Sequence, residues 1–149
     1  MGLKSSGVAQ ATVVSMDLEL QKYATIEAHK SKAKVKQIQI DLRRQFIFSI
    51  GEDRKLSVSN YGEQRKRLLH VKMSNVNPKT MKLHPDLQRL FVAMKQQILF
   101  VFDVSQPTPI AIHSIQLGHP ITRLNIDLRL NLLQGLTRRG SFMCFQLSQ

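Results

Sequence analysis

The sequence predicts an all-β protein built from a repeated unit of three or four antiparallel strands, and three observations support this. First, alternating apolar residues in Val35 to Asn60 lead to a turn, a second apolar run, a short polar turn and a third run. Alternation with a period of two is typical of half-buried strands. Second, the same pattern returns at Thr80 to Val104 and at Ile121 to Leu147. Third, the residue pairs that close the third run are spaced 43 and 43 residues apart; they are Ser59-Asn60, Phe102-Asp103 and Phe145-Gln146.

The length of the repeat points to propeller blades. A period of about 40 to 45 residues with several strands per unit is the sequence signature of that architecture. Asp41, Asp86 and Asp127, which lie 45 and 41 residues apart, are expected to form the turn after the first strand of three successive blades. Because each would then belong to a different blade, no two of them should act as an acid/base pair.

Taken in order, the chain divides into one propeller segment, 1–149, with two complete blades and two incomplete ones. A partial blade is predicted for 1–30, with strands at Ala9–Leu18 and Tyr23–Ala28, the second being its outermost strand. Full four-stranded blades are expected at 35–73 and 80–117, and a three-strand partial blade at 121–147. We therefore expect an open propeller whose exposed edges need a partner.

The first residues allow two interpretations. Met1 to Gly7 matches Gly135 to Gly140 at the glycines and the leucine, which favours a turn between two strands. The same opening fits the pattern for N-myristoylation, with Gly2 as the acceptor and Ser6 at the required position. The turn is the favoured interpretation, and acylation of Gly2 stays open.

Short motifs give the repeat a family resemblance. Gly118-His119 and Ala28-His29 precede first strands, Gly51-Glu52-Asp53 lies between a second and a third strand, and Phe102-Asp103 closes a third strand. This pattern resembles the WD-repeats of β-propellers. The chain departs from that pattern because it has no Trp, and because Gln96 and Arg139 stand where Asp53 would repeat.

The resemblance implies a structural role for several polar residues. In WD-repeats a loop His, a strand Ser or Thr, a turn Asp and the Trp form a buried hydrogen-bonded network. Here the matching positions are His29, Ser49 and Asp53, with Ser59 in place of the Trp, and His119 and Asp103 match the same motifs in later blades.

A narrower similarity covers the run from Gly7 to Ser59, which is similar to a blade of the WD-repeat proteins that carry a FYVE zinc finger. Those relatives dock on endosomal membranes through the finger. The finger is absent here, since Cys144 is the chain's one cysteine and a finger needs several closely spaced pairs. Cys144 lies in an apolar run and is expected to be a buried packing residue.

The strongest compositional signal is positive charge. The chain has 22 Lys and Arg against 10 Asp and Glu, a formal net charge of +12. Such an excess favours an acidic partner, either nucleic acid or an anionic membrane or protein. On the WD-repeat topology one face would gather Lys30, Lys32, Arg54, Lys55, Lys95, Arg138 and Arg139, and the opposite face would hold Arg43, Arg44, Arg65, Lys66, Arg67 and Arg129. Most phenylalanines, including Phe46, Phe48, Phe100, Phe102, Phe142 and Phe145, are assigned to the core, so base-stacking platforms are scarce.

Three functions remain, and none is enzymatic. No histidine spacing, phosphate loop or nucleophile elbow indicates catalysis, a metal or a cofactor. The favoured hypothesis is a noncatalytic protein-interaction scaffold whose partners are other subunits, a missing part of the same propeller or a second copy of the chain. The alternatives are a basic nucleic-acid-contacting subunit of a ribonucleoprotein and a membrane-associated adaptor. No signal peptide or apolar span is apparent, so an intracellular, cytoplasmic location is expected.

Overall fold

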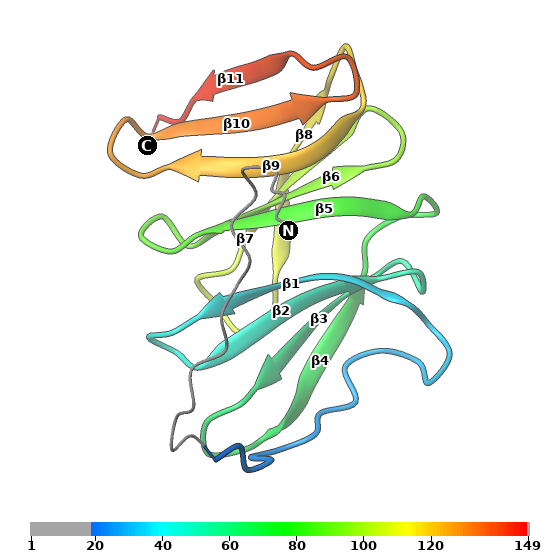
Figure 1. Ribbon diagram of the computed structural model, residues 1–149, viewed down its shortest axis with the longest axis vertical. Helices are drawn as coiled ribbons and strands as arrows, with labels where there is room; N and C mark the ends of the chain where they lie inside the picture. The colour runs from blue at the N-terminus through cyan, green and yellow to red at the C-terminus, as the bar shows by residue number, and fades with distance from the viewer. Residues whose placement is uncertain (1–18, 149) are drawn as a thin grey trace, which may run out of the picture.

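The computed structural model describes residues 19–148, which form three antiparallel β-sheets and no helix (Figure 1). The first sheet has the strand order β1-β2-β3-β4. Its strands are β1 (Val35–Asp41), β2 (Phe46–Gly51), β3 (Lys55–Asn60) and β4 (Lys66–Lys72). Consecutive strands pair through short polar turns, as the alternating sequence predicts.

The second and third sheets repeat this arrangement. The second sheet has the order β5-β6-β7-β8 and consists of β5 (Pro78–His84), β6 (Arg89–Met94), β7 (Ile98–Asp103) and β8 (Ile110–Gln116). The third sheet pairs β9 (Ile121–Asp127), β10 (Leu132–Thr137) and β11 (Phe142–Gln146), with β10 in the middle. The predicted all-β fold, with two four-stranded units followed by a three-stranded one, is confirmed.

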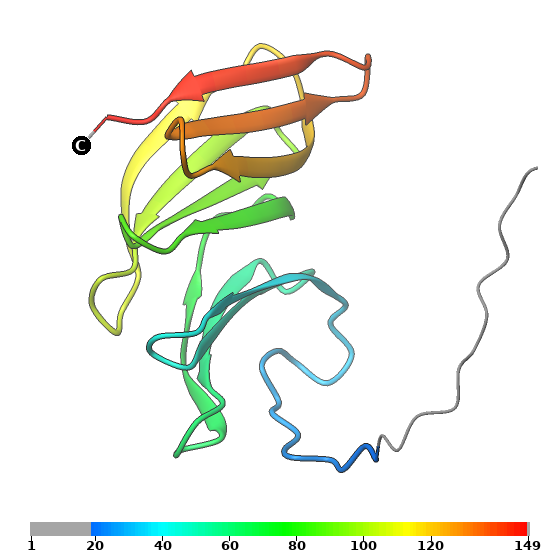
Figure 2. The ribbon, with the colours of Figure 1, turned by 60° about the vertical axis from the view of Figure 1, so that its left-hand side comes forward.

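The three sheets stack face to face like neighbouring blades. Their first strands, β1, β5 and β9, lie next to one another in the stack (Figure 1). Seen from the side in Figure 2, the second sheet lies between the other two. Within residues 19–148 the stack does not close into a ring, so the outer faces of the first and third sheets are not covered by another sheet.

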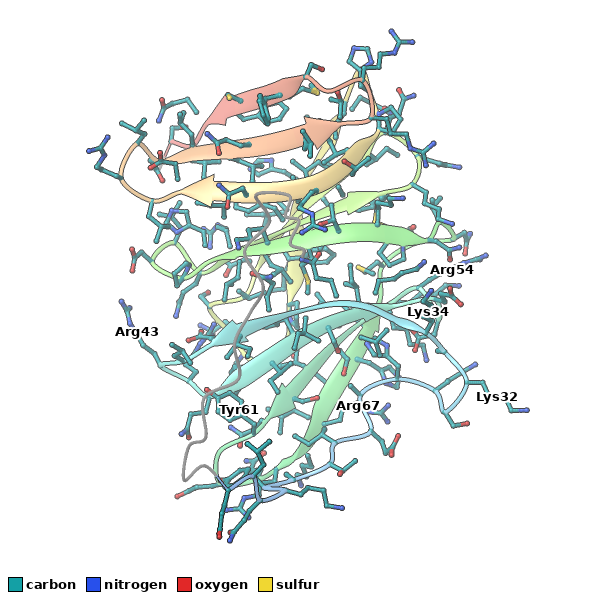
Figure 3. The ribbon with its side chains drawn as sticks, in the orientation of Figure 1. Lys32, Lys34, Arg43, Arg54, Tyr61 and Arg67 are labelled. Carbon is teal, nitrogen blue, oxygen red and sulfur yellow. The ribbon has the colours of Figure 1, made fainter. Side chains whose placement is uncertain are left out.

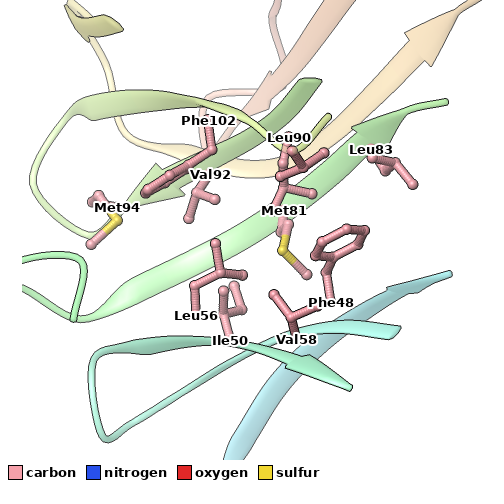
Figure 4. Packing of buried hydrophobic residues seen from close by; sticks show 11 residues of the cluster. Phe48, Ile50, Leu56, Val58, Met81, Leu83, Leu90, Val92, Met94 and Phe102 are labelled. Atoms are coloured by element: carbon pink, nitrogen blue, oxygen red, sulfur yellow. The ribbon is translucent and has the colours of Figure 1, made fainter. Parts of the chain in front are cut away.

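Two apolar clusters hold the stack together. Phe48 and Ile50 of β2, with Leu56 and Val58 of β3, meet the second sheet and form the first cluster (Figure 4). The second sheet contributes Met81, Leu83, Leu90, Val92, Met94, Phe102 and Val104 to this cluster. The second cluster joins the other face of the second sheet to Ile121, Leu124 and Leu133 of the third sheet. Because strand side chains alternate, one sheet can supply both clusters.

The structure gives the first and second strands of the three sheets a uniform spacing of 43 residues, whereas β4 and β8 are 44 residues apart. Gln45, Gln88 and Asn131 each follow a first strand, and each has a positive φ, of 58°, 50° and 56°. Their carbonyl groups accept hydrogen bonds from the backbone N–H that follows the third strand. The donors are Tyr61, Val104 and Leu147, at 3.0, 3.0 and 2.9 Å.

This spacing corrects one of the turn assignments. Asp41 and Asp127 accept hydrogen bonds from turn N–H groups, as expected, but the equivalent residue of the second sheet is His84, not Asp86. His84 Nδ1 accepts the N–H of Leu87 at 3.2 Å. Asp86 lies two residues further on and is exposed. An imidazole nitrogen can replace the carboxylate because the turn needs only an acceptor.

The predicted outermost strand at Tyr23–Ala28 is a second correction. This segment is irregular in the structure, because no described strand lies beside it to accept and donate backbone hydrogen bonds. Its predicted partner strand at Ala9–Leu18, the turn at Met1 to Gly7 and the acylation site at Gly2 lie outside the described residues.

Two core assignments in the third sheet are also wrong. Cys144 and Phe142 are exposed rather than buried. Both lie on the outer face of β11, while Met143 and Phe145 on the other face pack against the second cluster. The apolar pattern predicted burial on both faces, but the described residues supply a neighbouring sheet on one face only.

Candidate functional site: a polar network and a cationic rim

A hydrogen-bonded network joins the loop before β1 to the turn between β2 and β3. His29 Nδ1 lies 2.9 Å from Asp53 Oδ1 and 3.0 Å from Oδ2, and His29 Nε2 lies 2.9 Å from Ser49 Oγ. The structure therefore brings His29, Ser49 and Asp53 together. These contacts join the loop before β1 to the first sheet. They therefore hold that loop in place and do not form an open binding site.

The carboxylate of Asp53 is well supplied with donors. Burial by itself would raise the pKa of Asp53, but the hydrogen bond and the charge of His29 lower it, as do the backbone N–H groups of Lys55 and Lys30. The net result is a pKa below its usual value of 3.8. Space here is tight, since a Cβ added to Gly51 would lie 3.0 Å from His29 Nδ1. The network is therefore packed as a rigid structural unit.

The expected fourth member, Ser59, does not complete the network. Ser59 is buried, but its Oγ has no hydrogen-bond partner within the part of the chain that the structure describes. The same is true of Ser57 Oγ. Both hydroxyls belong to the sheet face that carries Ser49.

His119 and Asp103 do not form such a network. His119 is exposed at the edge of the third sheet, where Arg138 and Arg139 replace the acidic turn. Asp103 lies at the opposite end of its strand, where its Oδ1 accepts from the N–H and Oγ of Ser105 at 2.8 and 2.6 Å. These contacts, with a smaller effect of Arg89, lower the pKa of Asp103. Without a carboxylate in the turn, His119 has nothing to hold it inward.

Polar contacts between sheets fix their relative positions. Gln37 Oε1 accepts from Thr80 Oγ1 at 2.8 Å and from the N–H of Met81 at 2.7 Å. Gln39 Oε1 accepts from the N–H of Leu83 at 3.2 Å. Side-chain amides of β1 thus bond directly to the backbone of β5. Sequence analysis did not single out these glutamines, although their alternation on β1 was visible.

Arg44 forms a second contact between sheets. Its Nε donates to Asp41 Oδ2 at 2.7 Å, and its Nη1 donates to the carbonyl of Val104 at 2.6 Å. Burial would raise the pKa of Asp41, but the hydrogen bonds and charge of Arg44, with the N–H of Arg43, lower it. A cation assigned from the sequence to a basic cluster therefore serves to join the first two sheets.

The turns at one edge of the stack carry a row of cations, here called the cationic rim. The rim comprises Lys30, Lys32, Arg54, Lys79, Lys95, Arg138 and Arg139, at or next to the loops before first strands and the turns between second and third strands. Figure 3 shows Lys32, Lys34 and Arg54 at this edge and Arg43 at the opposite one. Arg54 Nε donates to Asn77 Oδ1 at 3.2 Å, in the connection between β4 and β5.

Lys55, the remaining residue of the predicted basic face, turns toward β4 instead. Its Nζ lies 3.3 Å from His70 Nε2. Burial lowers the pKa of His70, and the charges of Lys55 and Arg67 lower it further. The Lys55 ammonium group therefore lies beside His70 of β4 and is not part of the cationic rim.

The rim is hollowed between the second and third sheets. Two adjoining hollows, of about 440 and 230 Å³, share Pro120 and Arg138 in their walls. Their basic residues are Lys79, Lys95, His119, Arg138 and Arg139, and neither wall includes a carboxylate. Lys79 and His119 were not assigned to the basic face. The signal for Lys79 was its position 43 residues after Lys36.

Carboxylates near the rim are already engaged. Glu52 lies 3.6 Å from Lys36, and Asp53 is bound by His29. The ion pairs found in residues 19–148 do not involve Lys95, Arg138 or Arg139. The hollow therefore keeps its positive charge and can accept an anionic group.

Other classes of site find no support in residues 19–148. That part of the chain contains no group of three His, Cys, Asp or Glu side chains arranged to hold a metal ion. It also contains no helix that is long and apolar enough to span a membrane. The sequence matches no protein-family model, and it matches no curated protein.

Proposed function

We propose that this protein is a noncatalytic scaffold of the WD-repeat type, which assembles with other polypeptides through the outer faces of its sheet stack. The observation that carries the proposal is the exposure of apolar strand residues on those faces. Ile38 and Ile40 of β1 and Phe142 of β11 are exposed although they lie within strands, where apolar side chains normally mark a buried face.

The WD-repeat assignment is supported by several features together. The sheets repeat every 43 residues, the first strands lie side by side, and the network of His29, Ser49 and Asp53 has the composition that WD-repeats use. A stack of such repeats buries apolar area between neighbours. The two end faces of the stack are therefore suited to binding another protein, because their strands are already ordered and carry apolar side chains.

The scaffold proposal is tested by the native size of the tagged full chain in cells of its own source. Ile40→Asp and Phe142→Asp place a charge on the two outer faces. Burying an unpaired carboxylate costs several kcal/mol, so each variant should weaken the assembly at least tenfold. We expect the sedimenting particle to shrink toward the 17.0 kDa chain.

Matched controls make the same chemical change at exposed turn residues. Leu42→Asp and Leu128→Asp lie in the turns after β1 and β9, away from the sheet faces, and should leave the particle unchanged. Circular dichroism of each purified variant checks that it folds. A native particle that is unaffected by Ile40→Asp and Phe142→Asp would refute the scaffold proposal.

A second function, binding of nucleic acid, is favoured by the carboxylate-free hollow in the cationic rim. Phosphate contacts from Lys and Arg release counterions, so affinity should fall steeply with salt. The binding of fluorescent duplex and single-stranded RNA is measured by anisotropy between about 50 and 200 mM salt. Arg138→Glu with Arg139→Glu should abolish binding and flatten the salt dependence.

The control for this experiment reverses two charges at the opposite edge. Arg43→Glu with Arg129→Glu changes the net charge equally but leaves the rim intact. If both double variants weaken binding to the same extent, the effect comes from net charge, and the rim is not a nucleic-acid site.

A further inference from the structure

The two faces of the second sheet use different positions of the repeat. Met81 and Leu83 of β5 face the first sheet and are 0% and 6% exposed. Leu99 of β7 faces the third sheet and is 1% exposed. Each sheet thus has one face that receives the preceding sheet and one that receives the following sheet.

The outer faces carry apolar residues at those same positions. Ile38 and Ile40 precede Met81 and Leu83 by 43 residues and are 49% and 48% exposed. Phe142 follows Leu99 by 43 residues and is 73% exposed. The first sheet therefore presents one half of an inter-sheet interface, and the third sheet presents the other half. A single copy of the chain carries both halves.

The segment before β1 has the register of a fourth strand. It spans 23–29, which is the range of β4 (66–72) shifted by 43 residues, and it is joined to β1 by a connection as long as the one from β4 to β5. Within residues 19–148 this segment pairs with no strand, and one edge of β11 is also unpaired. The unpaired edge of β11 has free backbone N–H and C=O groups, which are the partners that this segment lacks as a strand.

The segment lies beside the first sheet, on the side of its outer face. Tyr23 Oη donates to the carbonyl of Gly62 at 3.3 Å, and the guanidinium of Arg65 lies 3.9 Å from the centre of the Tyr23 ring. Between the segment and the outer face of the first sheet is a hollow of about 490 Å³, lined by Ile26, Ile38 and other apolar residues. A neighbouring sheet in this place would fill the hollow.

We propose that the partner of this scaffold is a second copy of the chain, docked head to tail; the inference rests on the scaffold function proposed above. The outer face of β9–β11 of one copy stacks on the outer face of β1–β4 of the other, and Tyr23–Ala28 of the latter pairs with β11 as its fourth strand. Made reciprocally, these contacts give a closed ring of six sheets, within the range of four to eight that propellers have.

The pairing of third and fourth strands in the first two sheets narrows the residues that meet to two registers. In the first sheet Val58 lies opposite Leu69. Val58 shifted forward by 86 residues is Cys144 of one copy, and Leu69 shifted back by 43 residues is Ile26 of the other. In the second sheet Val101 lies opposite His113, a register that instead puts Cys144 opposite Glu27. Residues directly opposite in antiparallel strands have Cβ atoms about 4.5 to 5.5 Å apart, close to disulfide range. Cys144 is exposed and is the chain's one cysteine, so it provides a built-in probe.

The experiment uses the purified full chain. Sedimentation velocity should give twice the 17.0 kDa chain mass. Under mild oxidation either Ile26→Cys or Glu27→Cys should give a covalent dimer at more than half of the chain, and the dimer should disappear when the same variant also carries Cys144→Ser. Leu20→Cys, at a fully accessible position outside the segment, is the matched control and should crosslink at least tenfold more slowly.

Each other outcome overturns the inference. A monomer refutes the second copy as partner. A dimer that neither Ile26→Cys nor Glu27→Cys crosslinks refutes the strand pairing, and a ladder of larger covalent species refutes the two-copy ring. If the purified chain is a monomer while Ile40→Asp still shrinks the particle from cells, the scaffold function stands and its partner is a different polypeptide.

Discussion

His29 Nδ1, in the loop before β1, lies 2.9 Å from Asp53 Oδ1 in the turn after β2, and His29 Nε2 is hydrogen-bonded to Ser49 Oγ. The side chains of both residues are almost completely buried. A charged acceptor held by several donors in such a place contributes more to stability than an exposed ion pair.

We expect Asp53→Asn to lower the free energy of unfolding by about 2 kcal/mol, because hydrogen bonds to a charged group are stronger than those between neutral groups. Urea unfolding monitored by circular dichroism measures this. Ser49→Ala should cost about 1 kcal/mol. The double variant should lose less than the sum, since both changes act through His29. Asp86→Asn, on an exposed turn, is the control; an equal loss there would contradict the assignment.

The low pKa values of Asp41 and Asp53 predict an acid-labile stack. Both carboxyl groups have a pKa below 3.8 in the folded chain, so the unfolded chain takes up protons first as the pH falls. Their contribution is therefore complete above about pH 5 and is lost as the pH falls through the folded-state values. Thermal unfolding between pH 7 and pH 3 should show this loss, and Asp53→Asn should show a shallower one. If the melting temperatures of the wild type and Asp53→Asn fall in parallel with pH, Asp53 does not cause the loss of stability.

Ser57→Ala should leave stability unchanged or raise it by about 1 kcal/mol. The Ser57 hydroxyl is buried without a partner within residues 19–148, so its removal eliminates a desolvated polar group and loses no hydrogen bond. Ser49→Ala on the same sheet face serves as the comparison, because there the hydroxyl is bonded. A destabilisation by Ser57→Ala as large as that by Ser49→Ala would mean that Ser57 has a partner.

Gln37→Leu should destabilise the stack by about 1 to 2 kcal/mol, because the N–H of Met81 and the hydroxyl of Thr80 would lose their acceptor. Hydrogen exchange should rise at Met81 and remain unchanged in β10. Gln134→Leu changes the same side chain on the exposed face of β10 and is the control. Equal effects of the two variants would count against a contact between sheets at Gln37.

Much of the fold could be predicted from local pattern. The strands around Val35 to Asn60 and their two returns follow from alternation, and the repeat length predicted stacked sheets. The turn at His84 was missed because an imidazole does not resemble a carboxylate in sequence, although both accept an N–H. Tyr23–Ala28 was predicted as a strand from the same pattern, but a strand also needs a partner, which no local pattern supplies.

The candidate sites, too, could be predicted from the sequence only in part. Arg138 and Arg139 could be placed on one edge because turn positions follow from strand order. Their convergence with Lys79 and His119 around one hollow depends on how the second and third sheets pack, which lies beyond any local signal. Lys55 and Arg44 were assigned to basic clusters, and their partners, His70 and the carbonyl of Val104, are 15 and 60 residues away in the chain.

The sequence by itself determined the strands, their 43-residue repeat and the excess of positive charge, because alternation, turn chemistry and charge are properties of neighbouring residues. The tertiary structure decided which apolar faces are buried and which are exposed, and which cations meet. Burial depends on whether another sheet lies within contact distance. Ile38 and Met81 share a repeat position, yet one is exposed and the other buried, because Met81 has a neighbouring sheet on its face and Ile38 has none among the described residues.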